Sequence, residues 1–372
     1  VSHPLHPSAA SSSLNTSAEE YVTNLSEAEA SEYQRESNVA RENFRLLNLP
    51  DLQNTRLLLL EKLGSGAYGS VFRCSLGSLQ FAVKRVPKKV SPGTLQADLE
   101  LVDSLVNECR LLTALRHPNI VKCLGWEDYG EPINEFRVFF EYLGKGSFWD
   151  FLYFRKLENA PYTADELWYY AHQVASGLAY LHEHSIKHRD IKSANVVLDG
   201  NQSDFFFSTV KLCDFGVSTK QSLAESRVGT MQYNAPEVVS RKDTKYDSMK
   251  ADIWSFGMFL VEMLTLTAPY SQFEPKTRMT MIASGQLQPG LPQDSPIFPL
   301  LKKCTALNPT QRPTAMQIVQ EIEATMTPTA KKFLIEKDKL LQTQILSCYR
   351  RSLSKKVVQQ TASPRHQSHN SR

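Results

Sequence analysis

The sequence predicts an α+β architecture in which a β-rich first half is followed by a helical second half. Two observations support this prediction. Short apolar runs typical of strands dominate up to about residue 141, whereas apolar residues at helical spacing dominate after residue 147. Two such halves would leave a cleft between them, and clefts are the usual places for ligands.

The individual elements follow from these patterns. The predicted strands cover residues 57–63, 70–74, 79–86 and 136–141, and one helical stretch interrupts them near 101–115. The clearest predicted helices cover residues 164–182, 252–264 and 314–324. No internal repeat is visible along the chain.

The two ends of the chain differ in composition from its middle. Residues 1–55 are rich in Ser, Ala and Glu, and we predict a disordered or partly helical linker there. Residues 327–372 form a basic tail, in which an amphipathic helix over 330–353 precedes a disordered end. The apolar positions of this predicted helix are Phe333, Leu334, Leu340, Leu341, Ile345 and Tyr349. A solvated tail and docking on the protein body, a partner or anionic lipid all remain open.

The charge distribution and the cysteines limit the classes of protein to which this sequence can belong. The net charge is +3, but residues 331–372 alone carry +8, which leaves −5 for the rest. The net negative charge of these remaining residues therefore does not favour nucleic-acid binding. The six cysteines include no CxxC pair, which predicts free thiols and an intracellular, cytoplasmic location. No apolar run approaches a membrane span, and the start at Val1 suggests a longer parent chain.

A glycine-rich segment lies between the first two predicted strands. Residues 63–71 read LGSGAYGSV, in which Gly64, Gly66 and Gly69 have the spacing GxGxxG. Glycines allow the backbone to approach phosphates closely. A Gly-rich hairpin and a dinucleotide fingerprint are the alternatives, but the fingerprint requires a helix directly after the loop, whereas a strand follows here.

A lysine follows in the next predicted strand. Lys84 ends the apolar run 81–84, where it would supply a positive charge for phosphates, although an edge-strand lysine is the simpler interpretation. Such a lysine needs an anion to hold it. Glu108, in the predicted helix before the segment Leu-Arg-His-Pro, is the candidate.

Three further motifs decide between these interpretations. Residues 188–195 read HRDIKSAN, residues 214–216 read DFG, and residues 235–237 read APE. Together with the glycine loop and Lys84, they resemble the signature set of the eukaryotic protein kinase family, in the family's order. The resemblance covers residues 56–326. It implies a bilobal kinase fold with an N-lobe over 56–140, a hinge over 141–146 and a helical C-lobe over 147–326.

The resemblance also implies catalytic roles. Asp190 would orient and deprotonate the attacking hydroxyl, while Asn195 and Asp214 would hold Mg²⁺. Lys192 and Thr230 match serine/threonine-specific members of the family and would contact the catalytic aspartate. His188 would be a packing residue.

For ATP, the resemblance implies a binding site that runs from the glycine loop to the hinge. Lys84 and Glu108 would hold the phosphates, and the carbonyl of Glu141 and the amide of Leu143 would bind adenine. The other implied contacts are Leu63, Gly64, Ser65, Gly66, Ala67, Gly69, Val71, Ala82 and Cys213. Cys213 is open to a second interpretation as a small core residue.

Regulatory and structural roles complete the implied set. Ser226 matches an activation-loop phosphosite whose phosphate would pair with Arg189, although an unmodified serine is the alternative. Asp252 would hold the catalytic loop, and Glu237 would pair with Arg312.

The subgroup and the activity remain open at this stage. The segments IKSAN, GSF and WSFG look most like tyrosine-kinase-like serine/threonine kinases, and upstream-cascade kinases that phosphorylate other kinases are the near alternative. A pseudokinase, a binding module that acts through the flanking segments and a small-molecule kinase are the competing functions. Because Lys84, Asp190, Asn195 and Asp214 are all present, an active protein kinase is favoured.

Overall fold

The computed structural model describes residues 58–66, 69–76, 79–87, 109–129, 135–199, 208–214, 230–240, 247–288 and 290–336. The chain divides into two compact units. The first consists of Val1–Thr113 with Cys123–Tyr142, and the second consists of Ala114–Lys122 with Leu143–Arg372. Each unit is described by itself.

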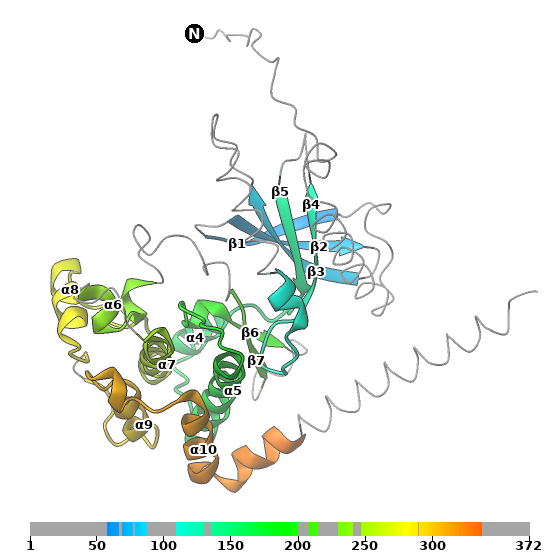
Figure 1. Cartoon of the computed structure of the whole chain (residues 1–372). Helices are drawn as coiled ribbons and strands as arrows, with labels where there is room; N and C mark the ends of the chain where they lie inside the picture. Colours follow the sequence, from blue (N-terminus) through cyan, green and yellow to red (C-terminus); the bar gives the residue numbers. More distant parts are fainter. Residues whose placement is uncertain are drawn as a thin grey trace, which may run out of the picture. The chain divides into compact units, whose positions relative to one another are not determined.

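The first unit is built on a five-stranded antiparallel sheet in the order β1-β2-β3-β5-β4 (Figure 1). Its strands are β1 Leu58–Gly66, β2 Gly69–Leu76, β3 Leu79–Pro87, β4 Cys123–Tyr129 and β5 Glu135–Glu141. The sheet confirms the predicted β-rich first half. Strand β4 was not predicted, because Gly125 and the acidic residues that follow it hide its apolar alternation.

Alternating side chains give this sheet its core. Cys74, Phe81, Val83, Leu124 and Phe139 form one buried cluster from four strands. Because successive residues of a strand point to opposite faces, this alternation fixes the register of the sheet.

The second unit is helical, which confirms the predicted second half, and it also carries the hairpin of β6 Val196–Asp199 and β7 Thr209–Leu212. Its longer helices are α4 Phe148–Leu157, α5 Ala164–Glu183, α7 Ser248–Thr265, α8 Pro275–Ser284 and α10 Ala315–Thr325, and the shorter ones are α6 Pro236–Ser240 and α9 Phe298–Cys304. Within the described ranges, no helix is both long and apolar enough to cross a membrane.

Helix α7 forms the centre of this unit. Every residue from Ala251 to Met263 is buried, so the helix has no solvent-facing side over this length. Gly257 allows the segment after α9 to approach α7, since a Cβ atom at this position would lie 2.6 Å from the Thr305 side chain.

Helix starts in this unit are specified by local sequence. Ser147, Thr163 and Thr314 cap α4, α5 and α10 with complete capping boxes, in which the third helical residue bonds back to the cap. Such reciprocal bonds satisfy backbone N–H groups that have no partner within the helix.

A buried ion pair joins α4 to α5. The guanidinium of Arg155 donates two hydrogen bonds to Glu166 and lies over the ring of Tyr162, 4.1 Å from its centroid. Glu166 also accepts from the backbone N–H of Thr163. Both charges are more than nine-tenths buried, so each depends on the other for its stability in this environment.

Replacing Glu166 with Gln should lower the free energy of unfolding by ~3 kcal/mol, because Arg155 would remain buried without its counter-ion. The matched control is Glu321→Gln, which breaks the exposed pair with Lys303 and should cost less than ~1 kcal/mol. Urea unfolding followed by circular dichroism measures both values. Equal losses in the two variants would contradict this interpretation of the buried pair.

Candidate active site

The loop between α5 and β6 holds Asp190 in a dense set of hydrogen bonds. Lys192 Nζ lies 2.6 Å from Asp190 Oδ2, and Asn195 Nδ2 donates to the same oxygen at 2.9 Å. The backbone N–H of Thr230 donates to Asp190 Oδ1 at 3.0 Å, and Lys192 also donates to Thr230 Oγ1 at 2.7 Å. These four predicted residues therefore lie together.

These contacts set the charge of Asp190. Burial acts to raise the pKa of this carboxyl, but the hydrogen bond and charge of Lys192, the Thr230 N–H and the Asn195 amide outweigh it, so the pKa lies below its ordinary value. Asp190 is therefore ionised at neutral pH. Burial lowers the pKa of the neighbouring His188, which favours its neutral form and a packing role.

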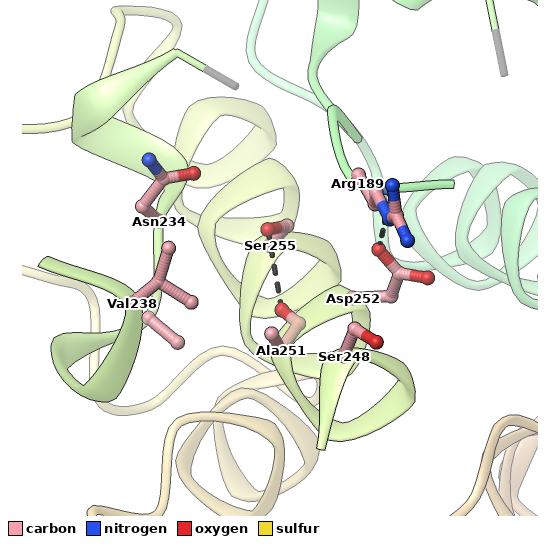
Figure 2. Close-up of a pocket in the computed structure, with 8 residues that line it drawn as sticks. Arg189, Asn234, Val238, Ser248, Ala251, Asp252 and Ser255 are labelled. Carbon is pink, nitrogen blue, oxygen red and sulfur yellow. Dashed lines mark hydrogen bonds between the residues drawn. The ribbon is translucent and has the colours of Figure 1, made fainter. Parts of the chain in front are cut away.

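Asp252 of α7 anchors the same loop from below (Figure 2). Its two carboxylate oxygens accept from the backbone N–H groups of His188 at 2.8 Å and Arg189 at 2.7 Å. His182 Nε2 lies 3.0 Å from Asp252 Oδ2. The contact stabilises a strained backbone, since Arg189 has a φ of 67°, which costs a non-glycine residue roughly 1 kcal/mol.

A second carboxylate of α7 joins two segments of the site. Glu262 accepts from Ser193 Oγ at 2.8 Å, from the Ser193 backbone N–H at 3.2 Å and from Tyr233 Oη at 2.7 Å. Burial raises the pKa of Glu262 to about 7, although these hydrogen bonds and Lys192 act against the shift. Glu262 therefore connects the loop of Asp190 to the segment that follows Thr230.

A small cavity of about 20 Å³ lies beside these contacts, and Figure 2 shows residues that line it. Its lining includes Arg189, Asp252 and Ser255 together with Asn234 and Val238. Ser255 Oγ donates to the carbonyl of Tyr233 and to that of Ala251. The volume suits one water molecule, so the cavity belongs to the support of the loop and is too small for a substrate.

The β6–β7 hairpin brings two predicted metal ligands close together. Val196 pairs with Leu212, and the backbone N–H of Cys213 donates to the carbonyl of Asn195 at 3.0 Å. Asp214 follows directly, is exposed and has a φ of 61°. The Asn195 amide nitrogen donates to Asp190, so the amide oxygen of Asn195 points away from Asp190.

The predicted nucleotide residues of the first unit lie on β1, β2, β3 and β5. Gly69 has a φ of 138°, and a Cβ atom there would lie 2.1 Å from the Arg85 carbonyl oxygen, so this position requires glycine. At Gly64 a Cβ atom would meet nothing within 4 Å. Lys84 is 7% exposed on β3, where its neighbours across the sheet are Val71 and Val138.

The remaining predicted nucleotide contacts fall into two groups. Leu63, Ser65 and Gly66 lie at the end of β1, Ala82 on β3 and Glu141 at the end of β5, while Leu143 and Cys213 belong to the second unit. Glu108, Ala67 and Ser226 lie outside the described residues, as do residues 1–57 and 337–372.

Glu237 and Arg312 form a bidentate ion pair. Arg312 Nη1 lies 2.6 Å from Glu237 Oε1, and Arg312 Nη2 lies 2.8 Å from Glu237 Oε2. Arg312 is 1% exposed, lies over the ring of Trp254 and donates to the carbonyl of Lys250. The pair fixes the segment 235–240 against α7 and the turn before α10.

Comparison with known proteins agrees with this geometry. The family described as protein kinase domain matches residues 57–322, which is most of the chain. The chain belongs to the protein kinase family.

Named relatives match most of this chain but only part of their own length. Mitogen-activated protein kinase kinase kinase 1 of Arabidopsis thaliana is 35% identical over 263 residues, and mitogen-activated protein kinase kinase kinase 3 of the same plant is 36% identical over 264. Each match covers 69% of this chain, but only 40% and 44% of the relatives. A serine/threonine-protein kinase of Saccharomyces cerevisiae is 31% identical over 309 residues, which cover 77% of this chain and 20% of the relative. The chain thus spans less than half the length of these relatives.

The kinase motifs did not identify every residue of this network. His182, Ser193, Tyr233 and Glu262 were not assigned to the site from the sequence. The one available signal was Glu262, a charged residue inside the apolar run 258–264, because a carboxylate on a fully buried helix requires polar partners. The hydrogen bonds of the other three depend on tertiary contacts that spacing along the chain does not show.

The pKa of Glu262 predicts a pH effect on the kinase domain. The pKa of Glu262 in the folded state, about 7, lies above its ordinary value of 4.5. Between pH 4.5 and 7 the folded state therefore keeps Glu262 protonated, whereas the unfolded state does not. Stability contributed by this group is therefore full below pH 4.5 and is lost as pH rises through 7. Relative to Glu262→Gln, the wild-type protein should lose up to ~3 kcal/mol of unfolding free energy between pH 4.5 and 7.

Urea unfolding of both proteins at several pH values measures this difference, and groups common to both cancel from the comparison. A difference that stays constant from pH 4.5 to 8 would show that Glu262 does not titrate in this range.

Proposed function

We propose that this chain is an ATP-dependent protein serine/threonine kinase that acts in intracellular signalling. The observation that carries the proposal is the network around Asp190, in which Lys192, Asn195 and Thr230 contact one carboxylate. Such a constellation suits phosphoryl transfer, in which catalysis depends on positioning and charge more than on covalent chemistry.

In the proposed reaction, Asp190 accepts a hydrogen bond from the serine or threonine hydroxyl of the substrate. The hydroxyl oxygen forms a bond to the γ-phosphorus of ATP, the bond to the β,γ-bridging oxygen breaks, and the proton moves to Asp190. Because the pKa of Asp190 is low, its main effect is to orient the hydroxyl and to take the proton late in the transfer. Lys192 adds positive charge beside the transferring group.

Protein kinases in general use ATP with Mg²⁺, and the residues of this chain fit both. Asn195 and Asp214 offer an amide and a carboxylate oxygen, which are the ligands that Mg²⁺ prefers. The ion would neutralise charge on the phosphates. Gly64, with open space around it, and Lys84 support phosphate binding by the first unit.

The remaining assignments keep the roles that the resemblance implies. Glu108 would hold Lys84, the backbone of Glu141 and Leu143 would bind adenine, and Cys213 would line the nucleotide site. Phosphate on Ser226 would pair with Arg189 and order the loop around it.

The names of the relatives support one substrate class. Of the two subgroups that the sequence left open, the upstream-cascade kinases include proteins named mitogen-activated protein kinase kinase kinase, such as those of Arabidopsis thaliana. We therefore propose that the substrate is another protein kinase. The contact of Lys192 with Thr230 supports serine and threonine as acceptors.

The flanking segments suggest where partners bind, and the free cysteines suggest where in the cell the protein acts. Scaffold or upstream proteins would bind the segments 1–55 and 327–372, and the basic tail also suits peripheral contact with anionic lipid. Cys74 and Cys304 are buried free thiols, which fits a reducing, cytoplasmic location.

The first test measures transfer of labelled γ-phosphate to a catalytically inactive protein kinase, with Mg²⁺ and with a chelator. Asp190→Asn should lower kcat about 10²–10⁴-fold, because the amide cannot accept the proton. The control Asp294→Asn makes the same chemical change at an exposed loop position and should leave the rate unchanged. Equal rates in Asp190→Asn and wild type would contradict the catalytic role.

Absence of transfer from the wild type, with ATP binding retained, would favour the pseudokinase alternative. A Ser226→Glu variant then separates a switched-off kinase, which gains activity, from a scaffold, which does not.

Phosphoamino-acid analysis of the product tests acceptor choice. We expect phosphoserine and phosphothreonine, because the Lys192–Thr230 contact is typical of kinases that act on these hydroxyls. Mainly phosphotyrosine would overturn the assignment.

A further inference from the structure

Helix α4 carries apolar side chains on its exposed face as well as on its buried face. Its inner face buries Phe148, Phe151, Leu152 and Arg155. The solvent side of a surface helix is normally polar, yet the outer face of α4 carries exposed apolar residues beside Asp150 and Lys156.

The outer face carries a regular apolar stripe. Trp149, Tyr153 and Leu157 are 42%, 59% and 65% exposed and follow one another at intervals of four residues. Residues at this spacing lie in one row on a helix. With Phe154, which is 44% exposed beside them, they present apolar surface on the order of 400 Å², an area typical of interaction sites.

The chain returns to one end of this helix after α10. Residues 328–336 form a further helix (Figure 1, orange), whose first turn is fixed to the start of α5. Thr327 Oγ1 donates to the carboxylate of Asp165 and accepts from the backbone N–H of Ala330, which is fully buried.

The start of α5 and the end of α4 share one corner of the unit. Arg155 of α4 is bound to Glu166 of α5, and the backbone N–H of Ala160 donates to the carbonyl of Arg155 at 2.9 Å. The C-terminal helix therefore starts at the Leu157 end of the apolar stripe. The 36 residues after Glu336 continue from the far end of this helix and belong to the same chain as α4, so their effective concentration relative to α4 is about 1 mM.

The tail has a matching stripe. Leu341, Ile345 and Tyr349 also follow one another at intervals of four residues. The helix that leads into the tail begins near the C-terminal end of α4, so a tail helix that reaches this surface from that end would run antiparallel to α4. In this arrangement Leu341 would lie beside Leu157, Ile345 beside Tyr153 and Tyr349 beside Trp149.

We propose that residues 337–353 form a helix that docks on the outer face of α4. The helix covers the stripe of Trp149, Tyr153 and Leu157 with its own apolar stripe. The inference is independent of the proposed kinase activity, because it rests on packing within the helical unit.

Trp149 provides a direct readout. Of the four tryptophans, Trp126, Trp168 and Trp254 are 5%, 3% and 1% exposed, so a neutral quencher such as acrylamide reports mainly on Trp149. In the full chain the tail should shield Trp149. Truncation after Glu336, or the double substitution Leu341→Asp with Ile345→Asp, should raise the quenching constant about twofold.

The matched control is Thr343→Asp with Ser347→Asp, which adds the same charge on the opposite face of the tail helix and should leave quenching unchanged. Equal quenching of the full and truncated chains would overturn the proposal. A difference that appears only as protein concentration rises would also overturn it, because the occupant of α4 would then be a second copy.

A cross-link tests the register separately. With Tyr153→Cys and Ile345→Cys in one chain, oxidation should form an intramolecular disulfide that mass spectrometry identifies. The pair Tyr153→Cys and Thr343→Cys should form it much more slowly. Equal yields from the two pairs would contradict the antiparallel register.

Discussion

The helical unit depends on one polar row along an otherwise apolar and fully buried helix. Asp252, Ser255 and Glu262 of α7 lie three and seven residues apart, which places them on one side of the helix. Each is bonded to a segment of the site: Asp252 to the backbone before Asp190, Ser255 to the carbonyl of Tyr233, and Glu262 to Ser193 and Tyr233. Removing one partner would leave a buried polar group unsatisfied, so the loops cannot leave this row without a large cost.

This constraint explains how an unfavourable backbone persists beside Asp190. Arg189 keeps its left-handed conformation because the Asp252 carboxylate binds two successive N–H groups there. The loop is therefore fixed before any substrate arrives. Hydrogen bonds from Lys192, Asn195 and Thr230 then complete the arrangement and keep Asp190 ionised. Charge that is preorganised in this way does not need to reorganise during a reaction, which is the main source of electrostatic catalysis.

The sequence predicted the parts of this arrangement that depend on local order. The β-rich and helical halves follow from periodicity, and Asp190, Lys192, Asn195 and Thr230 follow from motifs in the family's order. Strand β4 was missed because its glycine and charged residues interrupt the alternation. The contacts of Glu262 with Ser193 and Tyr233 span 69 and 29 residues. No short-range pattern encodes such a distance, whereas the presence of a carboxylate in an apolar helix does indicate that a distant partner exists.

The same reasoning applies in reverse to α4. Two features do not match their environment: a carboxylate on a buried helix, and an apolar row on the exposed face of α4. Folding of the helical unit alone favours neither of them. For Glu262 the partners lie within the described fold. For Trp149, Tyr153 and Leu157 the inner face of α4 already supplies the packing that holds the helix, through Phe148, Phe151 and the Arg155–Glu166 pair. The outer row therefore contributes little to folding, and its regular spacing is explained by an occupant with a row of its own. The tail of the same chain has one, in Leu341, Ile345 and Tyr349.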